Sequence, residues 1–403
     1  MPEYYQLREM CNDVSRISKA VIDEFILYYA VKRDNLDQEF ENRISRFRHT
    51  ERGMPSDWIG MIKAQYIVHR IFKHHGLISK YLNNAAIKDL DTEQQNYLRQ
   101  MACHSWRFSF SEIKANPAAD FYEMEDVFTG NTYLLYSTSI GEILSERPVI
   151  LWFNLIGFND DCWQTYGPIT GFQSFGADDI FFYATELNPS IESEADLLKD
   201  LENNPVPYMM LMSGSTYPLV QHGTFEVLQV TGENHSAIFD MQAMKKEFRI
   251  EYAEGVFKLS HEVWSESPHF AEGYYEEERR IIFLTALTDR GYLEMAKRLN
   301  TYKFNLPVDP DIRLHLPMLT VIKQLLKKDL VLNPYSHLFE VKPSTENELL
   351  MKNLNEFLLQ AMPYINDGKQ LNINALAKEK GIDPKIARDL LQKTIDKIKE
   401  LRK

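Results

Sequence analysis

The feature that most constrains the fold is an aromatic-rich stretch, residues 106–172, in which apolar residues alternate with small or polar ones. Over residues 106–110 a Trp and two Phe occupy every second position, which is the period of a half-buried strand. A longer apolar run at residues 149–156 predicts a strand that is buried on both faces.

A hairpin is predicted between these two segments. Residues 121–128 and 132–136 are strand-like, and the intervening Thr-Gly-Asn supplies a short turn that tolerates a positive φ. A second turn is predicted at Gly167-Pro168, and a further strand at residues 180–185. We therefore predict a central antiparallel β-sheet or small barrel over residues 105–205, in which no residue looks catalytic.

Helices are predicted on the amino-terminal side of this region, over residues 1–104. Apolar residues recur every three or four positions through residues 4–31, which forms one apolar helix face. A later helix is predicted to begin at Thr92, with Gln95 three residues on as in a capping box.

The second half of the chain predicts another α+β unit over residues 206–304. Its helix is predicted to be capped by Thr288 and Asp289. Two prolines in residues 306–311 mark a linker, and helical patterns predict a carboxy-terminal helical region over residues 312–403. The predicted strands of this half are residues 208–212, 225–230, 248–252, 256–260 and 280–285.

Composition narrows the functional classes. The 403 residues carry a formal net charge of −13, which argues against a surface that grips nucleic acid or anionic lipid as a whole. Three scattered cysteines form no disulfide framework and no zinc pattern, which is typical of a reducing compartment. No secretory apolar segment is evident at the start, and 18 apolar residues never run together. We therefore expect a cytoplasmic protein with no membrane contact.

Residues that could carry chemistry are weak candidates. The spacing of His69, His74 and His75 does not place metal ligands on one helix face, so we predict no metal and no cofactor. The acidic residues 192–202 are interrupted by leucines at helical spacing and predict a solvated helix face. The pair Asp178-Asp179 is interpreted as part of a turn. P-loop, nucleophile-elbow and dinucleotide-binding motifs are all absent from the sequence.

The carboxy-terminal segment differs from the rest in charge. From Ile373 onward nine Lys or Arg face five Asp or Glu, a net of +4, so the preceding residues carry −17. Residues 373–400 resemble a helix-turn-helix, with small Ala377, a turn at Gly381, and a seam of three apolar residues, Ile382, Ala387 and Leu390. Should the second helix enter a major groove, three side chains would reach phosphates or base edges: Lys385, Arg388 and Lys393. The same pattern also closes small helical bundles that touch no nucleic acid.

A family resemblance is carried by the motifs FSFSEI, EDVFTGNTY, VILWF and YGPI, which begin at Phe108, Glu125, Val149 and Tyr166. They resemble a loosely defined group of bacterial proteins in which this β-region often accompanies a zinc motif of the SecA carboxy-terminal type. The resemblance covers residues 90–172 and 245–300. The zinc motif itself is absent here, since the chain has only three separated cysteines. The resemblance therefore implies an α+β fold and a bacterial protein, and it provides no catalytic residue.

Two functional hypotheses follow. The first is a non-catalytic interaction protein that binds a protein partner and contacts nucleic acid through its basic carboxy-terminal segment. The alternative is an enzyme or small-ligand binder with a pocket between the two β-units, lined by four aromatic residues: Trp152, Trp163, Tyr166 and Trp264. Aromatic residues are more often core than ligand-binding surface, which favours the interaction protein.

Overall fold

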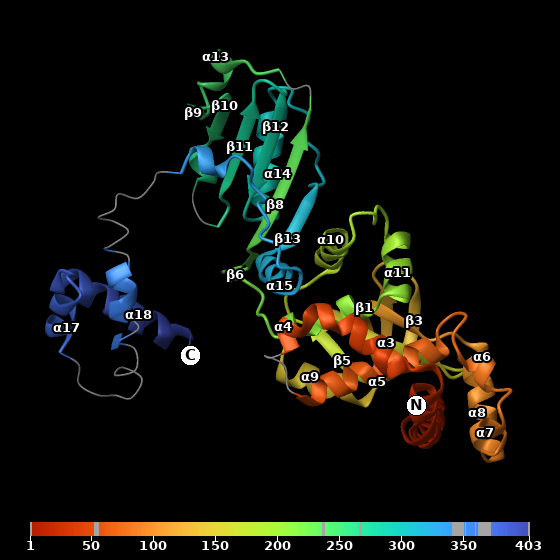
Figure 1. Cartoon of the computed structure of the whole chain (residues 1–403). Coiled ribbons are helices and arrows are strands. Elements are labelled where there is room, and N and C mark those ends of the chain that lie inside the picture. Colours follow the sequence, from red (N-terminus) through yellow and green to blue (C-terminus); the bar gives the residue numbers. More distant parts are fainter. Residues whose placement is uncertain are drawn as a thin grey trace. The chain divides into compact units, whose positions relative to one another are not determined.

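The computed structural model describes residues 2–51, 56–235, 238–265, 268–340, 350, 352–358, 360–361 and 372–401. The fold is α+β, as the sequence predicts, with amino-terminal helices, two principal sheets and carboxy-terminal helices (Figure 1). The chain divides into two compact units, residues 1–335 and 336–403. Within the described residues, no helix is both long and apolar enough to cross a membrane.

The amino-terminal layer is helical, in agreement with the periodicity. The long first helix is interrupted by a π-helical segment, η1, where Val21, Ile22 and Ile26 are fully buried. The helix at residue 92 is capped by Asp91, which accepts from the Gln94 amide, so the capping box predicted for Thr92 is wrong by one residue. The main elements are α1 (Pro2–Ser18), η1 (Lys19–Ile26), α2 (Leu27–Asp34), α3 (Leu36–Ile44), α5 (Ser56–Phe72) and α8 (Thr92–Cys103).

The central β-region is a closed five-stranded barrel, with strand order β1-β2-β3-β5-β4. The predicted hairpin is confirmed as β2 and β3, and the doubly buried strand as β4. Closure requires one parallel pair, between β3 and β5, so the sheet is not wholly antiparallel. The strands are β1 (Arg107–Ala118), β2 (Phe121–Asp126), β3 (Thr132–Tyr136), β4 (Leu151–Phe158) and β5 (Trp163–Phe172).

The barrel strands bury both faces because side chains alternate across each strand. On β1 and β4, Phe108, Phe110 and Phe153 pack outward into the large core that includes the amino-terminal helices. Side chains on the opposite face, together with Ile140 of helix α9 (Thr138–Glu146), form a separate apolar cluster in the barrel interior: Tyr122, Met124, Leu135, Ile140, Trp152 and Ile156.

Three local predictions in this region are wrong. Residues 180–185 are not a strand but part of helix α10 (Ala177–Leu187), and residues 208–212 lie in α12 (Val206–Met209) and the 3-10 helix η3 (Met210–Gly214). A short apolar run does not distinguish a buried strand from a buried helix. Gly167-Pro168 is no turn; β5 passes through it, with Gly167 at φ +75° beside an irregularity in the ladder.

A six-stranded antiparallel sheet follows, with strand order β13-β8-β12-β11-β10-β9. Helix α14 (Asp289–Asn300) packs on it and is capped by Thr288, as predicted. The edge strand β13 comes from beyond the proline-containing linker and pairs with β8. The strands are β8 (Leu228–Asn234), β9 (Arg249–Ala253), β10 (Val256–Ser260), β11 (Ala271–Glu276), β12 (Ile281–Ala286) and β13 (Ile312–His315).

Helix α15 (Leu316–Leu326) continues directly from β13 and joins the sheet to the first core. Its Met318, Val321 and Ile322 are fully buried in the large core, which also contains residues of α10 and η3. The approach is so close that a Cβ at Gly214 would lie 2.5 Å from Val321 Cγ2. The chain segment β13–α15 therefore links two cores that lie far apart in sequence.

In the second unit, α17 (Ile373–Glu379) and α18 (Pro384–Leu401) are joined by a short turn at Gly381, whose φ is +65°. Ile382 and Ala387 are buried at the seam, as predicted, but Leu391 is buried in place of the predicted Leu390. The shared core of this unit is Phe357, Ala361, Ala377, Ile382, Ala387 and Leu391.

Candidate functional site

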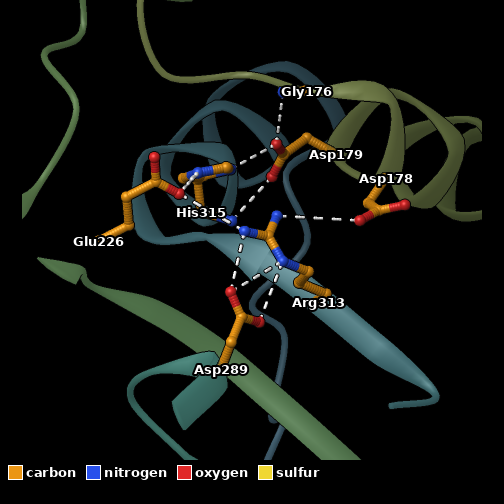
Figure 2. Close-up of polar contacts among 7 residues, drawn as sticks. All are labelled: Gly176, Asp178, Asp179, Glu226, Asp289, Arg313 and His315. Atoms are coloured by element: carbon orange, nitrogen blue, oxygen red, sulfur yellow. Dashed lines mark hydrogen bonds and ion pairs between the residues drawn. The ribbon is translucent and has the colours of Figure 1, made fainter. Parts of the chain in front are cut away.

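A cluster of charged side chains gathers where α10 meets β13 (Figure 2). Asp178 and Asp179 lie in the first turn of α10, and Arg313 and His315 project from β13. Two more carboxylates come from Glu226 on β7 (Phe225–Glu226) and Asp289 at the start of α14. We call this set the α10–β13 cluster.

Asp179 and His315 form its buried centre. His315 Nδ1 lies 2.7 Å from Asp179 Oδ2, and the His315 amide donates to Asp179 Oδ1 at 2.8 Å. Asp179 Oδ2 also accepts from the Gly176 amide at 2.8 Å, which caps the amino terminus of α10. The two side chains are only 1% and 5% exposed. Asp179 thus fixes both the start of its own helix and the ring of His315.

The protonation of His315 follows from this environment. Burial of the ring opposes the charged form, but the hydrogen bond and negative charge of Asp179 outweigh it, so the pKa of His315 is raised. Its Nε2 lies 3.4 Å from Glu226 Oε2, close enough for an ion pair but without hydrogen-bond geometry. Protonation of His315 therefore places a positive charge between two carboxylates.

Arg313 is held by three carboxylates. Its Nε and Nη2 each lie 3.1 Å from an oxygen of Asp289, a forked pairing that suits a guanidinium. Nη2 also lies 3.4 Å from Glu226, and Nη1 lies 3.8 Å from Asp178. Burial opposes the charge, but these acids prevail and raise the pKa of Arg313.

A pocket of about 570 Å³ opens beside the cluster, between α10 and the segment that leads into β13. We call it the α10–β13 pocket. It has acidic and aromatic walls: three aspartates, two phenylalanines and the single cation of Arg313. The lining residues are Asp178, Phe181, Phe182, Thr185, Asp309, Pro310, Asp311, Ile312 and Arg313.

The pocket lining has spare negative charge. Arg313 is already engaged by Asp289, Glu226 and Asp178, and the Asp311 carboxylate accepts from the Glu233 amide at 2.7 Å. Asp309 is exposed, and no hydrogen-bond donor or basic side chain among the described residues is paired with its carboxylate. With three aspartates against one arginine, the lining carries a formal charge of −2. Such walls suit a cation with an apolar body, because carboxylates pair with the charge and aromatic faces attract it.

The aromatic pocket candidates from the sequence do not converge. Trp152 and Trp163 share the barrel-interior cluster, where Trp163 also lies under the Arg107 guanidinium. Tyr166 packs against Trp106 and donates to Asp23, while Trp264 packs on the core of the six-stranded sheet. These residues are packing elements of three different cores.

The basic candidates lie in the second unit. Lys385, Arg388 and Lys393 are all exposed on α18. Arg388 Nε donates to the Pro384 carbonyl at 3.0 Å. Among the described residues, no group of three or more His, Cys, Asp or Glu could hold a metal ion. His69 is instead buried and lies 3.1 Å from Glu202.

Sequence reasoning did not bring the residues of the α10–β13 cluster together, and it identified Asp289 only as a helix cap. Asp178-Asp179 follows a glycine-containing segment, and this pattern predicts a turn rather than a helix start. Two acids opening a helix would have been the signal, but only once α10 was recognised as a helix.

No protein-family model matches the chain, and no significant match exists among curated proteins or solved structures. The resemblance to the bacterial zinc-motif group therefore stays a prediction.

Proposed function

We propose that the protein is a non-catalytic binding protein whose α10–β13 pocket takes up a basic side chain of a protein partner. One observation carries the proposal: a cavity of about 570 Å³ is lined by three aspartates and two phenylalanines, and its one cation is already paired. The volume lies in the range of specific ligand sites.

Binding is favoured over catalysis by the orientation of His315. An Asp–His pair can orient a general base, but the reactive nitrogen must face the reacting group. Here Nε2 is buried and faces Glu226, and His315 does not line the pocket. The Asp179–His315 pair therefore holds the two walls of the pocket in position. Its ring nitrogens do not reach a proton of a bound ligand.

The origin of the cation is inferred from the shape of the site. The pocket lies at the surface beside the exposed Asp309 and Asp311, so a side chain can enter while the rest of its polypeptide stays outside. We further infer that the protein acts in the cytoplasm, an inference supported by its three free cysteines.

The test is calorimetric titration of the full chain with a capped tri-arginine peptide, a capped tri-glutamate peptide and the small amine agmatine. Of these three ligands, we expect only the tri-arginine peptide to bind tightly. Asp309→Asn should weaken it about threefold to tenfold, the effect of one lost carboxylate worth ~0.6–1.4 kcal/mol.

The matched control is Glu123→Gln, which removes one exposed carboxylate from β2, away from the pocket lining. Equal weakening by both variants would mean non-specific attraction to an acidic protein. Equal affinity for agmatine and the peptide would favour a small-ligand binder over a protein partner.

A second candidate function is nucleic-acid binding through α18. It is supported by the common exposure of Lys385, Arg388 and Lys393 in a segment of net positive charge. Titration of the full chain with mixed-sequence DNA and RNA should show salt-sensitive binding that the double substitution Lys385→Glu, Arg388→Glu abolishes. Binding that persists in this variant, or no binding by the original chain, would eliminate this candidate.

A further inference from the structure

Two cysteines that are distant in sequence lie in contact outside the α10–β13 pocket. Cys11 belongs to α1, Cys162 immediately precedes β5, and their sulfurs are 3.3 Å apart across a separation of 151 positions. Both side chains are buried, at 0% and 1% exposure, whereas Cys103 is exposed on α8. The first two thiols are therefore placed to react with one another, and the third is not part of the pair.

Asn159 holds the pair in place. Its Nδ2 lies 3.6 Å from the sulfur of Cys11 and 3.7 Å from that of Cys162. Its Oδ1 accepts from the Cys162 amide at 2.8 Å, and Gln164 links the site back to the Cys11 carbonyl at 3.0 Å. An amide that donates toward both sulfurs favours negative charge on either one.

The two thiols are not equivalent. The hydrogen bond from Cys162 lowers the pKa of Cys11 and outweighs the burial that would raise it. The same contact, together with burial, raises the pKa of Cys162. These directions favour Cys11 as the attacking thiolate and Cys162 as the resolving thiol.

A surface pocket is lined by chain neighbours of both cysteines. A pocket of about 410 Å³ is lined in part by Met10 and Asp161, the chain neighbours of Cys11 and Cys162. Tyr4, Leu7 and Leu134 line the same pocket and pack on the apolar cluster that contains both cysteines. All three side chains therefore belong both to the pocket lining and to the apolar cluster that surrounds the sulfurs.

We propose that Cys11 and Cys162 are an oxidation site that reacts with hydrogen peroxide and closes into a reversible disulfide. The Cys11 thiolate attacks one peroxide oxygen, the O–O bond breaks, and hydroxide leaves to give a sulfenic acid. The Cys162 sulfur then attacks the Cys11 sulfur, the S–O bond breaks, and water leaves with the Cys162 proton. In total two thiols and one peroxide give one disulfide and two waters, so the sulfurs are oxidised and the peroxide oxygens reduced. The new bond would join α1 covalently to the loop before β5.

The experiment is peptide mapping of the folded full chain after peroxide treatment, with free thiols alkylated and no reductant added. The expected product is a Cys11–Cys162 linked peptide, lighter by two hydrogens than its separated halves and restored by dithiothreitol. Cys103 provides an internal reference and should remain alkylatable when the pair has already closed. Oxidation of Cys103 with Cys11 and Cys162 still as thiols would overturn the proposal.

Two variants test the assigned roles. Cys162→Ser should leave Cys11 as a sulfenic acid that dimedone traps, whereas Cys11→Ser should show no trapped acid at Cys162. Equal trapping in both would overturn the assignment of Cys11 as the attacking residue. Cys103→Ser is the matched control and should close the disulfide at the original rate. Circular dichroism of each variant confirms that the fold is retained, and the mapping of the original chain decides the proposal even if a variant does not fold.

Discussion

The imidazole Nδ1 of His315 lies 2.7 Å from Asp179 Oδ2, although 136 positions separate the two residues in sequence. His315 ends the edge strand of the six-stranded sheet, and Asp179 begins a helix that packs in the barrel-side core. Their neighbours Arg313 and Asp178 line the pocket on its two sides. The buried pair therefore sets how far apart the walls of the α10–β13 pocket stand.

Removal of the Asp179 carboxylate should destabilise the fold strongly. Asp179→Ala removes the carboxylate that pairs with the buried His315 ring and also the cap at Gly176, and breaking a buried pair in this way costs about 3–5 kcal/mol. Urea unfolding measures the loss. Asp178→Asn, a change at the neighbouring carboxylate whose side chain is 61% exposed, should stay within about 0.5 kcal/mol of the original protein. A similar small effect for Asp179→Ala would mean that the pair does not hold α10 to β13.

The contribution of His315 to stability should fall as the pH rises. Asp179 raises the folded-state pKa of His315 above its unfolded value of about 6.5, despite the opposing effect of burial. The stabilisation is therefore complete below about pH 6.5 and is lost as the pH passes the folded-state pKa. In urea titrations, the difference in unfolding free energy between the original protein and His315→Gln should therefore become smaller as the pH rises from about 6.5 through the folded-state pKa. A difference that widens with pH would contradict a charged His315.

His69 should show the opposite pH dependence. Its ring is fully buried against Phe108, and this burial lowers its pKa more than Glu202 raises it. Its stabilisation is present above the unfolded pKa of about 6.5 and is lost as the pH falls through the lower folded-state value. His69→Gln should therefore lose less stability on acidification below pH ~6.5 than the original protein does. If the unfolding free energy of the two proteins fell equally with decreasing pH, His69 would not be buried in its neutral form.

Local patterns in the sequence predict much of the sheet structure but little of the site. The β2–β3 hairpin and β4 follow from alternation, a glycine turn and an apolar run, which are all properties of neighbouring residues. The run at residues 180–185 satisfies a strand and a buried helix equally well, and its misassignment hid the acidic helix start. His315 has no sequence signal at all, because its role depends on β13 pairing at the far edge of a sheet.

Close packing at Gly214 should make it intolerant of any side chain. A Cβ there would lie 2.5 Å from Val321 Cγ2 and 2.9 Å from the Phe175 ring. Gly214→Ala should therefore cost about 1–3 kcal/mol in a urea titration. Gly60 is the matched control, since it lies within α5 and its Cβ would meet nothing within 4 Å. Gly60→Ala should stabilise the protein by about 0.5–1 kcal/mol through helix propensity, and equal effects of the two changes would contradict the tight contact of η3 with α15.

Neutralising Arg313 should tighten the binding of a cationic probe even though it weakens the fold. Arg313→Gln makes the formal charge of the pocket lining more negative, from −2 to −3, and frees Asp178 from its ion pair. The capped tri-arginine peptide should then bind about threefold to tenfold more tightly, with the largest gain at low salt because the added attraction is screened. Arg279→Gln, which removes an exposed arginine paired with Glu276, controls for the change in total charge and should leave the affinity unchanged. A weaker affinity in Arg313→Gln would mean that the guanidinium recognises the ligand directly, and the ligand of the α10–β13 pocket would then carry an acid group rather than a base.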